Sequence, residues 1–301
     1  MANNATRFFL EYYAYLVANA LINLLPRKAA FALGRLLGLL SLKLMKKRVN
    51  LAEDNLRRAF PEKSSPEIGT LLREHFMHLG VSAIEMLRLT RLQPGMPVEA
   101  EVQVIGEEHL KEAFALNKGV IFLSAHLGFW EIASVHIPNL GYPLDFVARK
   151  LKNPRLDVLL QETRSKHGCR FIDRRRGARK IVKALAQNRM VGILLDQHTT
   201  PSEATRVNFF NRPCWATPIV TQIAMKRGIP VVPTFVTRTR SDDYILEIQA
   251  PLILAGNSDD PEQLRINTQL LTDIIESAIR KNIPQWFWVH QRWRSMRPDP
   301  E

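Results

Sequence analysis

A histidine and a glutamate five residues apart follow an apolar segment in the middle of the chain. The segment 120–123 (VIFL) leads into His126, and Gly128 then permits a tight turn into a helix that carries Glu131. In open α/β sheets ligands bind where strands end, so His126 is expected to face a crevice. Glu131 is expected to accept a hydrogen bond from Nδ1 of His126, which leaves the other ring nitrogen able to take a proton from a hydroxyl. The pair therefore predicts general-base catalysis, and the alternative is a histidine that only caps the following helix.

The elements needed to position this pair follow a regular rhythm after residue 100. Short apolar segments alternate with amphipathic ones, which predicts an α/β fold with a mixed, largely parallel sheet flanked by helices. Two late strands joined by residues 240–243 predict a hairpin, and this is the antiparallel part of the sheet. Strands are expected at 101–106, 119–126, 143–150, 169–173, 190–197, 230–239 and 244–254, and helices at 66–90, 107–117, from 127 onward, 154–167, 178–188 and 261–281.

The N-terminal part of the chain is predicted to be a helical portion that associates with a membrane. Residues 8–26 and 29–45 are strongly apolar. The first run approaches the roughly 20 residues that cross a bilayer, but it contains one glutamate and two asparagines, which are costly there. Whether it spans the bilayer or lies in the interface stays open, and the alternative is a leucine-rich helix pair in a soluble core. We expect two domains: membrane-anchoring helices over 1–48 and an α/β domain over 49–301.

The charge of the chain points to an anionic partner. Lys and Arg number 42 against 29 Asp and Glu, a net charge of +13, and 46% of the residues are hydrophobic. More than half of this excess, +7, lies in residues 1–60 beside the apolar runs. A membrane surface fits this pairing, and we expect no nucleic-acid partner because the RRM, KH, helix-turn-helix and zinc-finger signatures are absent. The two cysteines, Cys169 and Cys214, have no metal-ligand spacing, so neither a metal site nor a disulfide framework is expected.

Several motifs in order resemble the lipid A late acyltransferase family of Gram-negative bacteria, within the glycerolipid acyltransferase superfamily. The first is the histidine motif itself, HLGFWE at 126–131. The resemblance covers nearly the whole chain. The other matching blocks are 55–61 (NLRRAFP), 162–168 (ETRSKHG), 196–197 (DQ), 207–213 (VNFFNRP) with Thr217, and 284–293 (PQWFWVHQRW).

The resemblance implies transfer of a fatty acyl chain from a thioester to a hydroxyl of a lipid A precursor, in lipopolysaccharide biosynthesis. It implies acyl carrier protein as the usual donor, and a location at the cytoplasmic face of the inner membrane. In this reading His126 is the general base and Glu131 orients it. Arg164 stabilises an oxyanion or a phosphate, unless it is only a cation on a helix surface. No resident cofactor is expected, because acyl carrier protein or CoA enters as the carrier of a co-substrate.

Further residues are expected to bind substrate. Asp196 ends an apolar strand as an active-site carboxylate would, although it is equally suited to capping the following loop. The arginines are expected to bind phosphates or an acidic carrier protein, and the alternative is that they form a solvated face. The two phenylalanines are expected to line an acyl-chain site, and the alternative is that they belong to the core. The expected substrate-binding residues are Arg149, Asp196, Arg174, Arg175, Arg176, Phe209 and Phe210. His290, flanked by tryptophans, is expected to be structural.

The acceptor and the donor remain open in the sequence. A related acyltransferase acting on a phosphatidylinositol mannoside with acyl-CoA is the first alternative. A membrane protein that binds glycolipids without catalysis is the second. The acyl-chain length depends on the depth of a pocket that the sequence does not measure.

Overall fold

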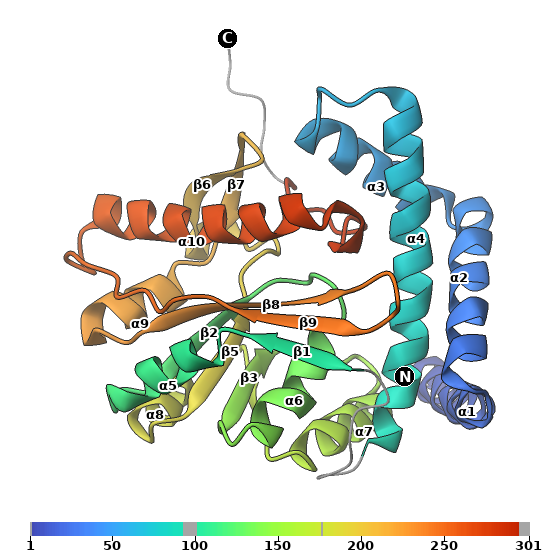
Figure 1. Cartoon of the computed structure of the whole chain (residues 1–301), viewed down its shortest axis with the longest axis horizontal. Coiled ribbons are helices and arrows are strands. Elements are labelled where there is room, and N and C mark those ends of the chain that lie inside the picture. Colours follow the sequence, from blue (N-terminus) through green and yellow to red (C-terminus); the bar gives the residue numbers. More distant parts are fainter. Residues whose placement is uncertain (1, 93–100, 176, 295–301) are drawn as a thin grey trace.

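Seven strands form one mixed sheet in the computed structural model, which describes residues 2–92, 101–175 and 177–294 (Figure 1). The strand order is β1-β9-β8-β2-β5-β3-β4, and every neighbouring pair is parallel except β8 and β9. The α/β fold and the hairpin at 240–243 are thus confirmed. The strands are β1 (Val102–Ile105), β2 (Val120–Ser124), β3 (Leu144–Ala148), β4 (Arg170–Asp173), β5 (Met190–Leu194), β8 (Val231–Arg238) and β9 (Tyr244–Ile248).

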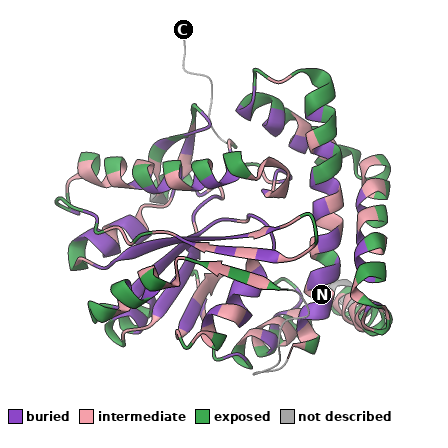
Figure 2. Ribbon diagram, viewed as in Figure 1, coloured by how far each residue is buried: buried purple, intermediate pink, exposed green. Residues whose placement is uncertain are grey.

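The central strands are buried on both faces because helices cover the sheet on either side (Figure 2). All five residues of β2 are buried, as the uninterrupted apolar run predicted. Alternate side chains enter two separate cores. Ile121 and Leu123 pack with α8, α9 and α10, whereas Val120 and Phe122 pack with α5 and α6. The helices are α5 (Glu107–Ala115), α6 (Ala133–Asn139), α7 (Pro154–Ser165), α8 (Ala178–Ala186), α9 (Ile219–Arg227) and α10 (Pro261–Lys281).

Two features of this domain differ from the sequence predictions. The helix expected from residue 127 begins later, as a 3₁₀ turn η2 (Trp130–Ile132) that leads into α6. Gly128 causes the delay, because it has a φ of +61° and its backbone lies so close to β8 that a Cβ would stand 2.0 Å from the Val236 carbonyl oxygen. A separate hairpin of β6 (Thr205–Phe209) and β7 (Arg212–Ala216), followed by α9, was not predicted.

Four helices precede the sheet: α1 (Ala2–Leu24), α2 (Arg27–Leu44), α3 (Lys46–Ala59) and α4 (Ser65–Arg88). A capping box between Ser64 and Glu67 starts α4. Glycines let α2 lie directly against α4 (Figure 1), since a Cβ at Gly38 would stand 2.1 Å from the Phe76 carbonyl oxygen. In the described ranges, no helix combines the length and the apolar character that crossing a bilayer requires. The domain division at residue 48 stays a prediction.

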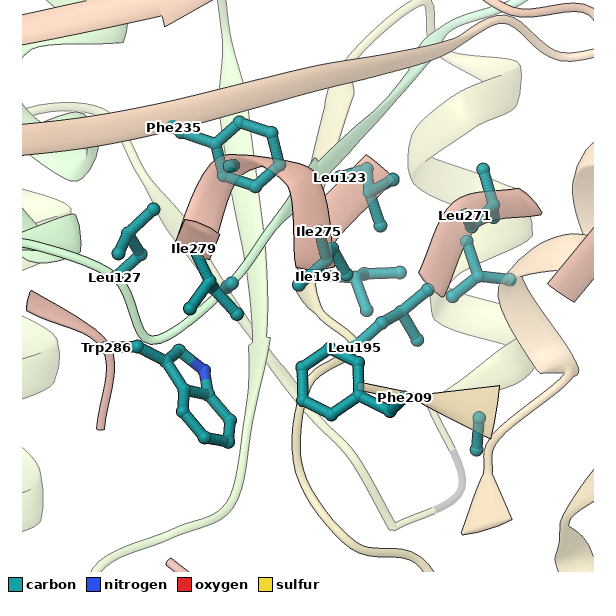
Figure 3. Packing of buried hydrophobic residues seen from close by; sticks show 14 of the residues in the cluster. Leu123, Leu127, Ile193, Leu195, Phe209, Phe235, Leu271, Ile275, Ile279 and Trp286 are labelled. Carbon is teal, nitrogen blue, oxygen red and sulfur yellow. The ribbon is translucent and has the colours of Figure 1, made fainter. Parts of the chain in front are cut away.

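The larger core lies between α10 and the face of the sheet that this helix covers (Figure 3). Ile275 and Ile279 of α10 pack in one cluster with Leu123 and Ile193 of the central strands. Trp286, just after α10, belongs to the same cluster and is almost completely buried. This core therefore supports the strand ends at which the site is built.

Candidate active site

The register of β2 and β5 places His126 beside Asp196. The two strands pair in parallel with Val120 opposite Met190 and Ser124 opposite Leu194, a constant offset of 70 residues. His126 and Asp196 each stand two residues beyond the paired ends, and the Leu195 N–H continues the ladder to the Ser124 carbonyl oxygen at 3.2 Å. The carboxyl ends of parallel strands meet at one edge of a sheet, so the two side chains are brought together there.

The His126 ring and the Asp196 carboxylate form a hydrogen-bonded pair. Nδ1 of His126 lies 2.8 Å from Oδ1 of Asp196, and the backbone N–H of His126 donates to Oδ2 at 2.9 Å. The Asp196 side chain is 1% exposed and the His126 side chain 21% exposed. Nε2 of His126 lies 3.1 Å from the Gln197 amide nitrogen. Because the Asp196 carboxylate accepts a hydrogen bond from Nδ1, this arrangement assigns the ring proton to Nδ1 and the lone pair to Nε2.

Asp196 is held ionised by the groups around it. Burial raises its pKa, but the nearby His126 ring, hydrogen bonds from His126 and one from the Trp286 indole outweigh burial and hold the pKa at about 2. The Trp286 Nε1–H donates to Oδ2 at 2.7 Å. The segment that carries Trp286 runs beside the histidine loop, where the Phe287 N–H donates to the His126 carbonyl oxygen at 3.0 Å. Asp196 is thus a fixed acceptor for His126 and more than a loop cap.

Glu131 pairs with Arg164, and the hydrogen bond expected between Glu131 and His126 was wrong. Nε and Nη2 of Arg164 donate to the two Glu131 carboxylate oxygens at 2.9 and 2.5 Å, and the Trp130 indole donates to Oε1 at 3.0 Å. Both Glu131 and Arg164 are largely buried. The turn at Gly128 explains the difference, since it delays the helix and Glu131 meets α7 instead of the imidazole. Arg164 is a buried ion-pair partner, with its guanidinium 4.1 Å from the Phe146 ring centre, and not a surface cation.

The basic candidates gather beside the site at the same edge of the sheet. Arg149 follows β3, and Arg174 and Arg175 follow β4, where the Arg174 N–H donates to the Ala148 carbonyl oxygen at 2.9 Å. All three arginine side chains are exposed. Arg174 also donates to Oγ1 of Thr199, in the loop after Asp196, at 3.1 Å. The expected site residue Arg176 lies outside the described residues.

Phe209 and Phe210 do not line an open site in this structure. Both side chains are buried at the turn of the β6–β7 hairpin. Phe209 packs against the Trp286 ring at 5.5 Å between centres, and Phe210 packs against Phe60 at 5.3 Å. Of the two readings given above, this burial agrees with a place in the core, because the hairpin folds its apolar end under α10. A role in binding an acyl chain stays a prediction.

His290 has the structural role that was expected. Its Nε2 accepts a hydrogen bond from the His198 backbone N–H at 3.0 Å, which requires that nitrogen to be unprotonated. Burial lowers the pKa of His290 to about 4, which keeps the ring neutral. It therefore supports the loop after Asp196 and is not a second base.

Three site residues escaped the sequence reasoning: Trp130, Gln197 and Trp286. The ring of Trp130 meets the His126 ring edge-on, with centres 4.8 Å apart. Both tryptophans stand in the motifs quoted above, but the sequence contained no signal that their indole nitrogens hold carboxylates. Over the ranges that the structure describes, no group of three or more His, Cys, Asp or Glu side chains is placed to hold a metal ion.

Comparison with known proteins gives one family and several similar relatives. The family model described as bacterial lipid A biosynthesis acyltransferase matches residues 2–295. The chain is 27% identical to a lipid A biosynthesis lauroyltransferase of Escherichia coli (strain K12), covering 91% of this chain and 88% of the relative. A palmitoleoyltransferase of lipid A biosynthesis from the same organism is 25% identical, covering 90% and 87%. A myristoyltransferase of lipid A biosynthesis from that organism is 22% identical, covering 81% and 74%.

Proposed function

We infer that this chain, which belongs to the bacterial lipid A biosynthesis acyltransferase family, transfers a fatty acyl chain from a thioester to a hydroxyl of a lipid A precursor. In this reaction His126 is the general base. Family membership makes the chain an acyltransferase. The observation that carries the proposed chemistry is the His126–Asp196 pair at the carboxyl edge of the sheet, in which Asp196 engages Nδ1 and leaves Nε2 as the basic nitrogen.

In the proposed reaction Nε2 of His126 accepts the proton of the acceptor hydroxyl as its oxygen attacks the thioester carbonyl. A carbon–oxygen bond forms, and the tetrahedral intermediate then collapses with breakage of the carbon–sulfur bond. The proton on His126 passes to the leaving thiolate, which restores the neutral ring. Asp196 keeps Nδ1 protonated and stabilises the transient imidazolium. Gln197, which contacts Nε2, gives way to the hydroxyl.

Glu131 and Arg164 are proposed to act as one unit. Glu131 fixes the guanidinium of Arg164 through two hydrogen bonds and is itself fixed by the Trp130 indole. Trp130 also packs against the His126 ring, so the pair is tied to the base through one aromatic side chain. A guanidinium held in this way is preorganised to stabilise negative charge on the thioester carbonyl or on a phosphate, without reorganising during the reaction.

The proposed donor is the thioester of acyl carrier protein. The exposed cations after β3 and β4, at Arg149, Arg174 and Arg175, adjoin the loop after Asp196 through the bond to Thr199. A cationic surface speeds the encounter with an acidic protein. The chemistry described here requires no metal and no redox cofactor.

A second observation favours action at a membrane, which we propose to be the cytoplasmic face of the inner membrane. Leucines at helical spacing are exposed along α1 and α2, and Leu24 is 81% exposed. Exposed apolar side chains at helical spacing are typical of an interaction site. Exposed lysines occur in the same segment, at Lys28, Lys43 and Lys46, which suits anionic lipid headgroups. The exposed apolar residues of this membrane-facing surface are Phe9, Leu10, Tyr13, Val17, Leu21, Leu24, Leu36, Leu37, Leu40, Leu44 and Met45.

The test is acyl transfer by detergent-purified protein, with carrier-protein and CoA thioesters offered against lipid A precursors and mannosylated phosphatidylinositol. Product masses identify donor, acceptor and chain length together. We expect His126→Ala to abolish transfer while vesicle binding stays unchanged. Near-normal transfer by His126→Ala contradicts the mechanism. Product on the phosphatidylinositol mannoside alone contradicts the acceptor, and wild-type protein that binds glycolipid without transfer contradicts the catalytic role.

A further inference from the structure

Asn55, on α3, begins one of the sequence blocks quoted above, and the proposed reaction gives it no role. It is buried, with 3% of the residue exposed. Its amide group donates to the carbonyl oxygens of Trp288 and His290 at 2.7 and 2.8 Å. Arg48 of the same helix donates to the carbonyl oxygen that lies between them, on Val289, at 3.1 Å. Side chains of α3 therefore bind three consecutive carbonyl groups near the carboxyl end of the chain.

These carbonyl groups belong to an irregular segment, residues 286–292, which we call the clamp segment. Within the ranges that the structure describes, these residues form no helix, and their strand pairing is limited to a bridge between Trp286 and Leu127. Backbone groups that are buried outside regular structure need other hydrogen-bond partners. The position of the clamp segment therefore depends on the side chains that bind it, and Asn55 supplies two of these bonds.

The clamp segment contacts both loops that carry the proposed catalytic pair. The Phe287 N–H donates to the His126 carbonyl oxygen at 3.0 Å, and the Trp286 indole donates to Asp196 at 2.7 Å. These two bonds come from adjacent residues, so the segment fixes the two loops relative to each other. Among the described residues no hydrogen bond joins Asn55 to His126 or Asp196, so its influence on them passes through the segment.

The other end of the clamp segment fixes the loop that follows Asp196. Arg292 is 1% exposed and donates to the carbonyl oxygen of Gln197 at 3.2 Å. His290 accepts a hydrogen bond from the His198 backbone N–H at 3.0 Å. The segment thus holds three consecutive residues of this loop.

We propose that Asn55 is a positioning residue of the acyl transfer, which acts through the clamp segment to keep His126 and Asp196 in hydrogen-bonding geometry. The inference rests on the proposed function, because it takes His126 as the base. Catalytic groups must be held to within about 0.5 Å of their productive geometry. Without the amide of Asn55 two carbonyl groups of the segment lose their donor, and the segment shifts relative to the two loops.

The experiment compares acyl transfer by the full chain with Asn55→Leu and with Asn267→Leu. Leucine has nearly the shape of asparagine and donates no hydrogen bond. Asn267, on α10, is the matched control, because its amide also donates to two backbone carbonyl oxygens, both at 3.0 Å. We expect Asn55→Leu to lower kcat at least tenfold at temperatures where the protein is folded, with the KM for the thioester within twofold of the wild-type value. Asn267→Leu is expected to keep both values.

Two readouts separate positioning from a general loss of stability. The midpoint of the acidic limb of the pH–turnover profile is expected to move in Asn55→Leu in the same direction as in Asp196→Asn, whereas a loss of stability alone leaves the midpoint in place. In NMR spectra of the chain with ¹⁵N-labelled histidine, the Nδ1 proton of His126 is expected to exchange with solvent at least tenfold faster in Asn55→Leu than in the wild type. His126→Ala assigns this resonance.

Arg48 provides a second variant that is not expected to affect folding, because its side chain is exposed. Arg48→Gln removes the donor to Val289 and is expected to lower kcat about threefold. Arg57→Gln, an exposed arginine of the same helix that pairs with Glu53, is the matched control and leaves kcat unchanged.

Three results overturn the proposal: an unchanged pH midpoint in Asn55→Leu, an equal loss of turnover in Asn55→Leu and Asn267→Leu, or equal kcat in Arg48→Gln and the wild type. If the wild-type protein transfers no acyl chain, the proposed function fails, and the NMR measurement decides the positioning on its own. Equal exchange of the His126 Nδ1 proton in the wild type and in Asn55→Leu then overturns it.

Discussion

Breaking the ion pair between Glu131 and Arg164 tests whether Glu131 acts through the arginine or through His126. The perturbation is a cycle of Glu131→Gln, Arg164→Gln and the double variant. Glutamine keeps an acceptor for the Trp130 indole, so the loss is confined to the contact with Arg164. The structure predicts that the ion pair is lost in each single variant and that Asp196 still holds His126 in all three.

The expected magnitude follows from burial and geometry. The two hydrogen bonds are 2.9 and 2.5 Å long, and the side chains of Arg164 and Glu131 are 11% and 6% exposed. Removing one partner of a buried pair leaves an uncompensated charge, which costs about 3–5 kcal/mol of unfolding free energy. The double variant removes both charges, so it is expected to lose less than the sum of the singles, with a coupling of about 2–3 kcal/mol. Denaturant unfolding in detergent measures the unfolding free energy of the wild type, the two single variants and the double variant.

A matched pair at the opposite edge of the sheet supplies the control. Arg189 donates to Asp145 at 2.9 and 2.5 Å, with side chains 12% and 4% exposed. Arg189→Gln is expected to destabilise the fold as much as Arg164→Gln does, and to keep the turnover number at temperatures where the protein is folded. The variants of Glu131 and Arg164 are expected to lose turnover together and non-additively, since they act as one unit.

The pH dependence of turnover separates the two readings of Glu131. If Glu131 acts through Arg164, the midpoint of the acidic limb of the pH–turnover profile is expected to stay unchanged in Glu131→Gln. The same midpoint is expected to move in Asp196→Asn, because Asp196 contacts the base His126. A shifted midpoint in Glu131→Gln with unchanged stability would refute the reasoning, because it would mean that Glu131 contacts His126 in the working enzyme.

Three other predictions use stability or binding as the readout. Asp196, whose pKa is held at about 2, stabilises the fold above pH 4 by about 2 kcal/mol and loses this as the pH falls to 2, so acid unfolding of Asp196→Asn is expected to be flatter across that window. Burial lowers the pKa of His75 to about 4, so the unfolded chain takes up the proton first and the fold loses about 3 kcal/mol of stability as the pH falls from 6.5 to 4. His75→Gln, followed by denaturant unfolding, is expected to remove this loss. Replacing Leu21 and Leu24 together by Ser is expected to weaken vesicle binding at least tenfold in flotation assays, because each leucine that enters the bilayer contributes about 1.5–3 kcal/mol. The control Leu270→Ser on α10 is expected to leave vesicle binding unchanged.

The sequence predicted most of the elements because their signals are local. The final helix, α10, has the predicted bounds of 261–281, since Asp260 caps its first turn and Pro261 opens it. The β6–β7 hairpin was missed, because its turn uses Phe210 and Asn211 at positive φ, and a phenylalanine there is not a recognised turn signal. The start of α6 was misplaced for a tertiary reason, the close approach of Gly128 to β8.

The sequence singled out His126, Asp196, Glu131 and Arg164, which the structure joins in two pairs, but it paired His126 with Glu131, and strand register accounts for the difference. His126 and Asp196 were each identified as polar residues after an apolar strand, but nothing local in the sequence says which strand lies beside which. In the sheet β5 is the neighbour of β2, and each residue of β2 lies opposite the residue 70 positions later in β5. This pairing makes Asp196 the partner of His126. Glu131 was assigned to His126 because it is near in sequence, yet its real partner, Arg164, stands on α7. In a parallel sheet, therefore, equal distances beyond two adjacent strand ends indicate an interacting pair better than a short spacing along the chain does.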